Sequence, residues 1–303
     1  MSEDRRNPGV GAGAGPGVQL FRQMTVCGVG LIGGSLALIA RRAGVVGKVV
    51  GLGRSQANLD VAIERQTIDV ATRDPVEAAR GADLIVLAVP IMTMRATLEK
   101  MIAHAAPDAV VTDVGSVKGF VVHELEPLIT GKRSLVAAHP VAGKETTGAA
   151  AADPALFRDR RVIITPSAKS TPDAINKIEQ LWSETGACVE MMDPATHDEL
   201  LARASHLPQI VSSVLAAALA GERVGEKLAL EYGASGLRDM TRLAASSWEM
   251  WRDIFISNRE AIAAALKLYG ATFAEFQRLA EAGDGAGLEK IFNRGKQMRE
   301  RIR

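Results

Sequence analysis

The stretch VCGVGLIGGSLA, residues 26–37, constrains the fold more than any other part of the chain, because glycines interrupt an otherwise apolar run. The preceding residues, 24–27, are typical of a short buried strand, and residues 35–43 predict a helix. The glycines between them fall at a strand-to-helix turn. They are Gly28, Gly30 and Gly33.

A turn of this kind is suited to holding a dinucleotide. Gly28 allows a tight bend, Gly30 leaves room for a pyrophosphate, and Gly33 lets the helix pack closely on the strand. The N-terminus of the helix offers N–H groups to an anion. A second apolar strand, residues 48–53, follows at the spacing of a βαβ unit. That spacing favours a dinucleotide site over a glycine turn that binds nothing.

Strand and helix patterns alternate over the first two thirds of the chain. The continuous apolar run at residues 82–90 is typical of a parallel strand covered on both faces. Further strands are predicted at residues 109–114, 135–139, 161–166 and 188–192. Past Asp193 only helical periodicity remains. We therefore predict an α/β fold, a Rossmann-like doubly wound, mostly parallel sheet followed by an all-helical domain.

This pattern predicts three parts of the chain: a disordered leader at residues 1–22, a dinucleotide-binding domain at 23–193 and a helical domain at 194–303. The leader is rich in glycine and proline and lacks the apolar segment of a signal peptide. Amphipathic stretches near the C-terminus have apolar faces that must pack against the other domain or a second subunit.

Composition narrows the classes of partner. The formal net charge of +1 gives no basic field for nucleic acid or an anionic membrane, and no run approaches the ~18 apolar residues of a membrane span. Cys27 and Cys188 are isolated and are expected to be reduced core residues, with no metal site. We expect a cytoplasmic protein that acts on a small molecule.

Polar residues at predicted strand ends are the candidates for chemistry, because ligands of doubly wound sheets bind beyond the carboxyl ends of the strands. Ser116 and Lys118 follow one strand, and His139 ends another, before Pro140. A neutral imidazole at His139 would accept a hydroxyl proton while Ser116 orients that hydroxyl. The alternatives are a structural histidine and a serine that caps a helix. No G-x-S-x-G motif marks Ser116 as a nucleophile.

The helical region holds two further polar groups, SHLPQ at residues 205–209 and an arginine-rich stretch at 236–255. Arg238 and Arg242 are one helical turn apart and would share a face. Solvated surface charge is the ordinary explanation of such a pair. A guanidinium facing a cofactor domain would instead suit the capture of a carboxylate.

Five motifs in order, GVGLIGGS, DVGSVK, HPVAG, SHLPQ and RDMTR…WRDIF, together resemble the prephenate/arogenate (cyclohexadienyl) dehydrogenase family of tyrosine biosynthesis. The resemblance implies a dinucleotide-binding domain, a helical domain that forms a homodimer, and oxidative decarboxylation of a cyclohexadiene with hydride transfer to NAD(P). It implies these roles: His139 is catalytic with Ser116 as its partner, Arg242 binds a carboxylate, and His206 and Trp251 line the substrate pocket.

The choice between NADP and NAD depends on the end of the second strand, GLGRSQAN. An NAD site commonly has a carboxylate there for the ribose hydroxyls, and here none is present. Arg54 with Ser55 would pair with a 2′-phosphate, unless Arg54 stacks on adenine or faces solvent. NADP is therefore preferred and NAD is the alternative. The predicted cofactor residues are Gly28, Gly30, Leu31, Ile32, Gly33, Arg54, Ser55, and the apolar pair Val89 and Pro90.

Two other functions remain open from the sequence. One is another two-domain NAD(P)-dependent hydroxyacid dehydrogenase, which would use a lysine of the helical domain, Lys227 or Lys267. The other is a non-catalytic nucleotide-sensing module, which would keep the glycine turn without needing His139. Within the family that the chain resembles, the sequence does not distinguish prephenate from arogenate as the substrate.

Overall fold

A computed structural model describes residues 18–144 and 146–302 of the 303-residue chain. The chain divides into two compact units, one ending at His197 and one beginning at Asp198. Most of the expected leader, residues 1–17, lies outside the described residues. Its last two residues, Phe21 and Arg22, are instead part of the first strand.

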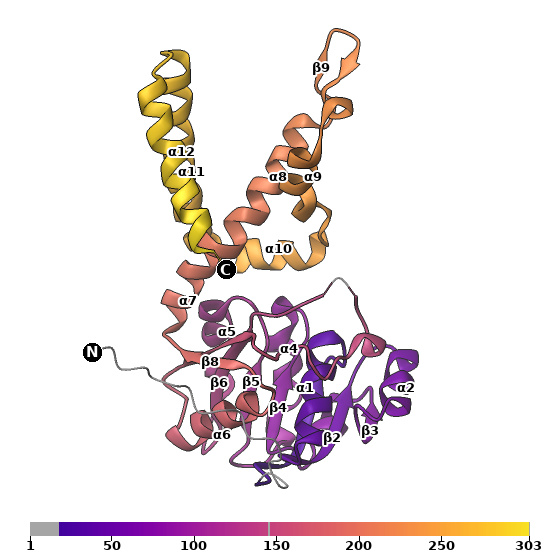
Figure 1. The fold of residues 1–303 in the computed structure, drawn as a ribbon. Helices are drawn as coiled ribbons and strands as arrows, with labels where there is room; N and C mark the ends of the chain where they lie inside the picture. The colour runs from indigo at the N-terminus through magenta and orange to yellow at the C-terminus, as the bar shows by residue number, and fades with distance from the viewer. Residues whose placement is uncertain (1–17, 145, 303) are drawn as a thin grey trace, which may run out of the picture. The chain divides into compact units, whose positions relative to one another are not determined.

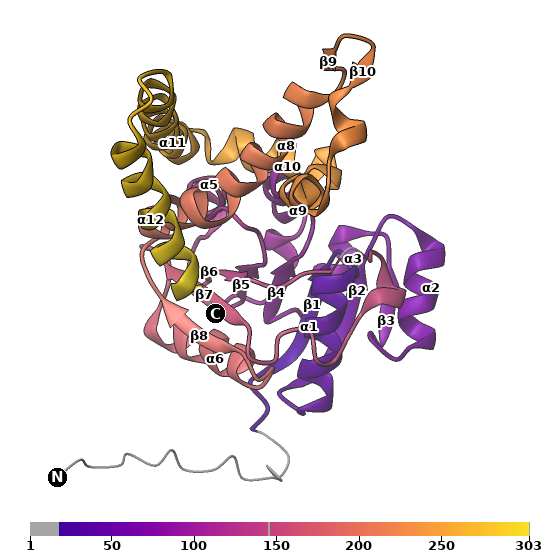
Figure 2. The same ribbon diagram turned by 45° about the horizontal axis from the view of Figure 1, so that its top comes forward.

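The first unit contains an eight-stranded sheet in the order β3-β2-β1-β4-β5-β6-β7-β8 (Figure 1, Figure 2). All neighbouring strands are parallel except β6 and β7. The doubly wound, mostly parallel sheet predicted from alternating patterns is thus confirmed. Its strands are β1 (Phe21–Cys27), β2 (Val46–Leu52), β3 (Val70–Thr72), β4 (Leu84–Leu87), β5 (Val110–Asp113), β6 (Ser134–Pro140), β7 (Arg161–Pro166) and β8 (Cys188–Met191).

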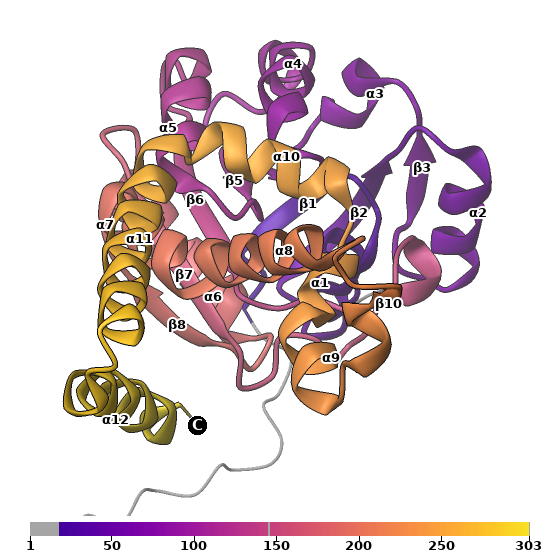
Figure 3. The same cartoon turned by 90° about the horizontal axis from the view of Figure 1, so that it is seen from above.

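Helices cover both faces of this sheet, with α3, α4 and α5 along one face and α1 and α6 along the other (Figure 3). The α-helices are α1 (Leu31–Arg42), α2 (Gln56–Glu64), α3 (Pro75–Ala79), α4 (Met94–Glu99), α5 (Lys118–Leu125), α6 (Pro172–Ser183) and α7 (Pro194–Leu201). Short 3-10 helices are η1 (Ile91–Thr93), η2 (Ile102–His104), η3 (Glu126–Leu128) and η4 (Ala149–Ala151).

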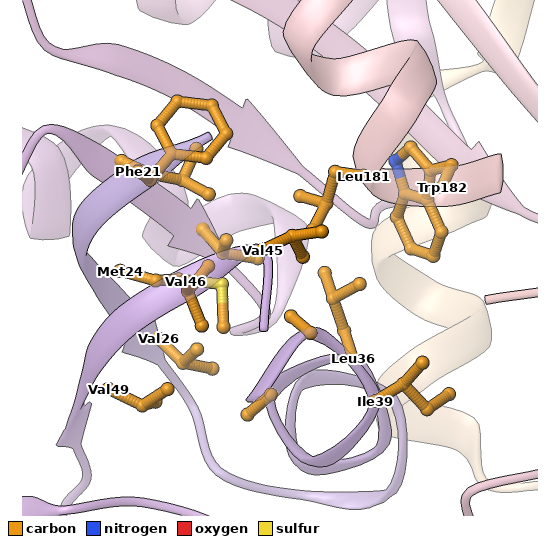
Figure 4. Close-up of a cluster of buried hydrophobic side chains, with 14 of the residues drawn as sticks. Phe21, Met24, Val26, Leu36, Ile39, Val45, Val46, Val49, Leu181 and Trp182 are labelled. Carbon is orange, nitrogen blue, oxygen red and sulfur yellow. The ribbon is translucent and has the colours of Figure 1, made fainter. Parts of the chain in front are cut away.

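Strand β1 shows why both faces need cover. Its side chains alternate between the faces, as the strand period of two requires. Met24 packs in a fully buried cluster with Leu36 of α1 and Trp182 of α6 (Figure 4). The next residue, Thr25, donates a 2.7 Å hydrogen bond from Oγ1 to the carbonyl of Ala78 in α3. Residues 24–27 of β1 are therefore buried on both faces of the sheet.

Three local expectations were wrong. Helix α1 begins at Leu31 and not at Ser35, so Gly33 lies in its first turn. Strand β3 was missed because three residues are too few to show a period. Cys188 is exposed on β8 and is no core residue, whereas Cys27 is buried as expected.

The second unit is helical, as predicted, apart from one small hairpin. Its helices are the π-helical η5 (Ala202–His206), α8 (Leu207–Leu219), the 3-10 helices η6 (Ala229–Tyr232) and η7 (Arg242–Ala245), and α9 (Ser235–Thr241), α10 (Trp248–Ser257), α11 (Arg259–Glu281) and α12 (Gly285–Arg301). The two-residue strands β9 (Arg223–Val224) and β10 (Lys227–Leu228) pair antiparallel around Gly225, whose φ is +62°. Strands this short leave no pattern in the sequence. No helix in the described ranges is both long and apolar enough to cross a membrane.

Candidate active site

The glycine turn between β1 and α1 is shaped by packing at two positions and by open space at the third. A Cβ on Gly28, whose φ is +96°, would lie 2.3 Å from the carbonyl oxygen of Ala88. A Cβ on Gly33 would lie 2.4 Å from the carbonyl oxygen of Gly28. A Cβ on Gly30 would meet nothing within 4 Å. Gly28 and Gly33 therefore let strand, helix and loop approach closely, and Gly30 keeps a space clear.

A cavity of about 1100 Å³ opens beside this turn, beyond the carboxyl ends of β1, β2, β3 and β4. Six of the predicted cofactor residues line it, namely Gly28, Gly30, Arg54, Ser55, Val89 and Pro90. The other three, Leu31, Ile32 and Gly33, do not line it. They belong to the first turn of α1, where no side chain caps the backbone N–H groups. The cavity, the open glycine and the uncapped helix start together fit a dinucleotide.

Arg73 also lines this cavity and was missed by the sequence analysis. It follows β3 directly, and β3 pairs with β2, which precedes Arg54. Two arginines thus come to one end of the cavity. Both are exposed, and neither forms an ion pair with a residue that the structure describes. Recognising β3 would have revealed Arg73, but three residues gave no signal.

The second group of interest lies at the end of β6. His139 is 8% exposed, and its Nδ1 lies 2.8 Å from Nε2 of His197, which is fully buried in α7. The two rings meet edge to face, with centroids 5.1 Å apart. His197 was not singled out from the sequence, since 57 residues separate the two in the chain.

A buried ion pair supports the backbone beside His139. Lys118, at the start of α5, is fully buried and forms an ion pair with Asp113 at the end of β5. Its Nζ also donates to the carbonyl of Ala138 at 2.8 Å, while the Asp113 carboxylate accepts from the N–H groups of Ala138 and Gly115. Lys118 is therefore a brace between β5, β6 and α5.

Ser116 lies in the loop between β5 and α5 and is half-buried. The N-cap of α5 is Val117, with no side-chain cap, so the idea that Ser116 caps the helix is wrong. Strands β5 and β6 are parallel neighbours. Ser116 and His139 therefore follow adjacent strand ends at one edge of the sheet, the arrangement in which a doubly wound fold binds its ligands.

Within the second unit, the structure brings His206 and Trp251 together, with ring centroids 6.0 Å apart and edge to face. Asn258 holds the histidine, because its Nδ2 donates to Nδ1 of His206 at 3.2 Å and to the carbonyl of Asp198 at 2.9 Å. His206 is 1% exposed and Trp251 is half-buried. The structure thus brings these two residues of the predicted substrate pocket into one cluster.

Arg242 is exposed at the start of η7. Helix α9 ends at Thr241 and Arg242 begins η7, so the two arginines, expected one turn apart on a helix, belong to two consecutive helices. The lysines of the hydroxyacid alternative lie elsewhere in this unit. Lys227 rests 5.7 Å from the ring centroid of Tyr232 in an exposed hairpin, and Lys267 is exposed on α11. Among residues 18–144 and 146–302, no three His, Cys, Asp or Glu side chains gather as metal ligands.

The doubly wound sheet, the glycine turn and the cavity at its carboxyl edge define a dinucleotide-binding protein. Residues 36–191 match the family model described as the nucleotide-binding domain of prephenate dehydrogenase, and residues 193–294 match its dimerization domain. The chain belongs to the prephenate dehydrogenase family, whose members are NAD(P)-dependent oxidoreductases. The match begins after the glycine turn, so the assignment of that turn depends on its own geometry.

Individual relatives cover nearly the whole chain. A cyclohexadienyl dehydrogenase from Zymomonas mobilis is 32% identical over 92% of this chain and 96% of its own length. The structure of a prephenate dehydrogenase from A. aeolicus, in complex with hydroxyphenyl propionate and NAD+, is 30% identical with a TM-score of 0.87, covering 93% of this chain and 98% of its own. A Synechocystis arogenate dehydrogenase is 31% identical with a TM-score of 0.82, covering 93% of this chain and 100% of its own.

Proposed function

We propose that this protein catalyses the oxidative decarboxylation of prephenate to 4-hydroxyphenylpyruvate in tyrosine biosynthesis, with NADP+ preferred over NAD+. Arogenate, which carries an amino group in place of the side-chain keto group, is the second candidate substrate. The observation that best supports the proposal is the position of His139 at the end of β6, on the same carboxyl edge of the sheet as the dinucleotide cavity. A proton acceptor beside a hydride acceptor is what oxidation of a ring alcohol requires.

When bound, NAD(P)+ supplies the hydride acceptor for the ring carbon that bears the hydroxyl. His139 accepts the hydroxyl proton at Nε2 as the hydride leaves that carbon. It returns the proton to the same oxygen once loss of carbon dioxide has restored an electron pair to the ring. Ser116 orients the hydroxyl, and Arg242 binds a carboxylate of the substrate. His206 and Trp251 line the pocket for the substrate side chain.

Preference for NADP is supported by the two arginines at the ends of β2 and β3. Arg54 and Arg73 line one cavity, and the residues at the end of β2 include no carboxylate for the ribose hydroxyls. Ser55 caps α2 by accepting from the N–H of Asn58 at 3.3 Å, which leaves its hydroxyl proton for donation. Two guanidiniums and a hydroxyl match the charge and acceptors of a 2′-phosphate.

Titration of each dinucleotide tests this preference. Arg54→Ala is expected to weaken NADP+ binding by about 10- to 100-fold, the scale of one charge-assisted hydrogen bond, and to change NAD+ binding little. Arg42→Ala, which removes an exposed arginine outside the cavity, is the control. Unchanged NADP+ affinity in Arg54→Ala would refute the pairing.

We also propose a cytoplasmic homodimer formed through the second unit. The match of residues 193–294 to a dimerization domain supports the dimer. Helices α11 and α12 support it too, because they expose large apolar side chains, among them Phe273, Phe276 and Phe292. A small anionic substrate suits an enzyme of the cytoplasm.

The proposed reaction is tested by the initial rate of nicotinamide reduction with prephenate or arogenate, each with NAD+ or NADP+. Turnover with prephenate and NADP+ as the fastest pair is the expected result. His139→Asn should lose most of the turnover number while it still binds the dinucleotide, and Arg242→Gln should raise the KM for the substrate. If no pair is turned over although the cofactor still binds, the result would favour a hydroxyacid dehydrogenase or a nucleotide-sensing module.

A further inference from the structure

The contact between His139 and His197 affects the tautomers of both rings as well as their positions. Their ring nitrogens, Nδ1 and Nε2, are 2.8 Å apart, which is hydrogen-bond distance. His139 is 8% exposed and His197 is fully buried, so this bond is shielded from competing water. One proton lies between the two nitrogens, and the nitrogen that carries it determines the tautomer of both rings.

Only one direction of this bond is compatible with a general base at His139. A neutral imidazole has one N–H and one acceptor nitrogen. If Nδ1 of His139 donates, its Nε2 is the acceptor that can take a proton from a hydroxyl. If Nε2 of His197 donates instead, Nε2 of His139 carries the proton and cannot act as a base.

We propose that His197 is a positioning residue for His139: its Nε2 accepts the hydrogen bond from Nδ1–H of His139, which holds His139 in the tautomer with a basic Nε2. This inference rests on the proposed function. The proton taken from the substrate hydroxyl goes to Nε2 of His139, and the Nδ1–H bond to His197 remains. His197 thus orients the base and stabilises the imidazolium without becoming charged itself.

The backbone segments that carry the two histidines are held in place by hydrogen bonds of their own. His197 lies in the first turn of α7, where Asp193 accepts from the N–H of Thr196 at 2.9 Å and from that of His197 at 3.0 Å. The strand residue before His139, Ala138, has both backbone groups bonded to the buried pair of Asp113 and Lys118. These bonds hold the two backbone segments, and the 2.8 Å contact between the ring nitrogens then orients the rings.

Several elements around this pair carry charged groups. On β5 and α5 they are Asp113 and Lys118, which neutralise one another. Asp193 directly precedes α7, and Asp198 follows His197 within that helix. The antiparallel neighbour on β7 is Ile163, which is apolar. In a Ser-His-Asp triad, the acceptor of the Nδ1–H bond is a carboxylate, which both orients the histidine and raises its basicity. Here the acceptor is a neutral imidazole. It orients His139 but raises its basicity less than a carboxylate would.

Three variants test the role of His197. His197→Leu removes the acceptor, His197→Gln keeps an acceptor oxygen near the position of Nε2, and His123→Gln replaces an exposed histidine of α5 as the control. His197→Leu should lower kcat by about 10- to 100-fold, as loss of a partner that orients a ligand histidine does elsewhere. It should leave the KM for the dinucleotide unchanged. Its acid limb in the pH profile of kcat/KM should shift to lower pH, because the imidazolium has lost its acceptor. His197→Gln should recover most of the rate.

Nitrogen-15 NMR of the full-length protein labelled in histidine gives a readout that needs no turnover. In the wild type, Nδ1 of His139 should be protonated and Nε2 should not. In His197→Leu the two tautomers of His139 should mix. A wild-type His139 with its proton on Nε2 would overturn the inference, as would a His197→Leu protein with unchanged tautomer and pH profile.

These outcomes separate the inference from the proposed function. If the wild type turns over no cyclohexadiene, the function is wrong, and the NMR tautomer still decides the direction of the hydrogen bond. If His197→Leu fails to fold, the wild-type spectrum and His197→Gln carry the test. A His197→Gln protein that folds but is as slow as His139→Asn would also count against a positioning role.

Discussion

At the scale of single residues, the glycine turn shows that identical residues serve different needs. Gly28 and Gly33 have backbone or Cβ atoms within 3 Å of where a side chain would begin, whereas Gly30 faces open space. The spacing of the three glycines was visible in the sequence. Which of them the fold needs, and which the ligand needs, became visible only with β4 and its following loop in place.

Alanine at two of these positions should separate folding from binding. Gly33→Ala is expected to lower the free energy of unfolding by about 1–3 kcal/mol, because its Cβ would overlap Gly28 and Ala88. Gly30→Ala should fold with a change within about 1 kcal/mol, since its φ of −109° suits any residue. It should weaken dinucleotide binding by about tenfold or more. Urea denaturation and dinucleotide titration measure the two effects. Equal loss of stability in both variants would contradict this division.

The two cysteines should differ sharply in reactivity. Burial raises the pKa of the Cys27 thiol to about 12, and Cys188 is exposed. At pH 8 a disulfide reagent should label Cys188 quickly and Cys27 only on unfolding, as a Cys188→Ser variant will show. Between pH 9 and 12 the unfolded thiol ionises while the folded one does not, so this group makes the free energy of unfolding fall as pH rises. Rapid labelling of folded Cys188→Ser would contradict the burial of Cys27.

At the scale of elements, the start of α5 is tied to two strands by one buried ion pair. Lys118 and Asp113 are both fully buried, and each also bonds to backbone groups of neighbouring segments. Such a pair contributes position more than net stability, because desolvation offsets much of the attraction. It fixes the loop that carries Ser116 against the strand end that carries His139.

Removing one partner of this pair should be costly. Lys118→Met is expected to lower the free energy of unfolding by about 3–5 kcal/mol, since it leaves Asp113 buried without a counter-charge. Adding Asp113→Asn should recover part of the loss. Lys177→Met, which breaks an exposed pair with Asp173 on α6, should cost no more than about 1 kcal/mol. Urea denaturation compares the three proteins. Similar losses for Lys118→Met and Lys177→Met would show that the buried pair holds nothing in place.

At the scale of the whole molecule, the second unit buries little of its apolar surface within one chain. Its compact cluster contains Ala202, Ile262 and Ala265, whereas several aromatic side chains of α11 and α12 are exposed. Large apolar side chains exposed in number on two helices mark an interaction surface. Because residues 193–294 match a dimerization domain, we expect a second copy of the chain to cover this apolar surface.

A charge placed on this face should weaken the dimer. Phe273→Glu is expected to shift sedimentation towards the monomer, because a carboxylate would be buried against apolar partners. Ala271→Glu is the control, since it lies two residues away and so on the opposite side of a helix with 3.6 residues per turn. A Phe273→Glu protein that stays dimeric at micromolar concentration would exclude this face from the interface.

The sequence by itself determined the fold class and most of the strands, because the period of apolar residues records local geometry and burial. It also contained the glycine turn, His139 and Ser116, whose positions at strand ends follow from chain order alone. The sequence did not indicate β3, the hairpin of β9 and β10 or the break between α9 and η7, since segments this short cannot repeat a pattern.

Only the tertiary structure decided which distant residues share one environment. Arg73 joins Arg54 through the pairing of β3 with β2, and His197 reaches His139 across 57 intervening residues. It also turned Lys118 from a candidate polar group into a buried brace. The physical reason is that periodicity reports how each segment meets the core, whereas hydrogen bonds and ion pairs between segments depend on strand order and register, which no local pattern encodes.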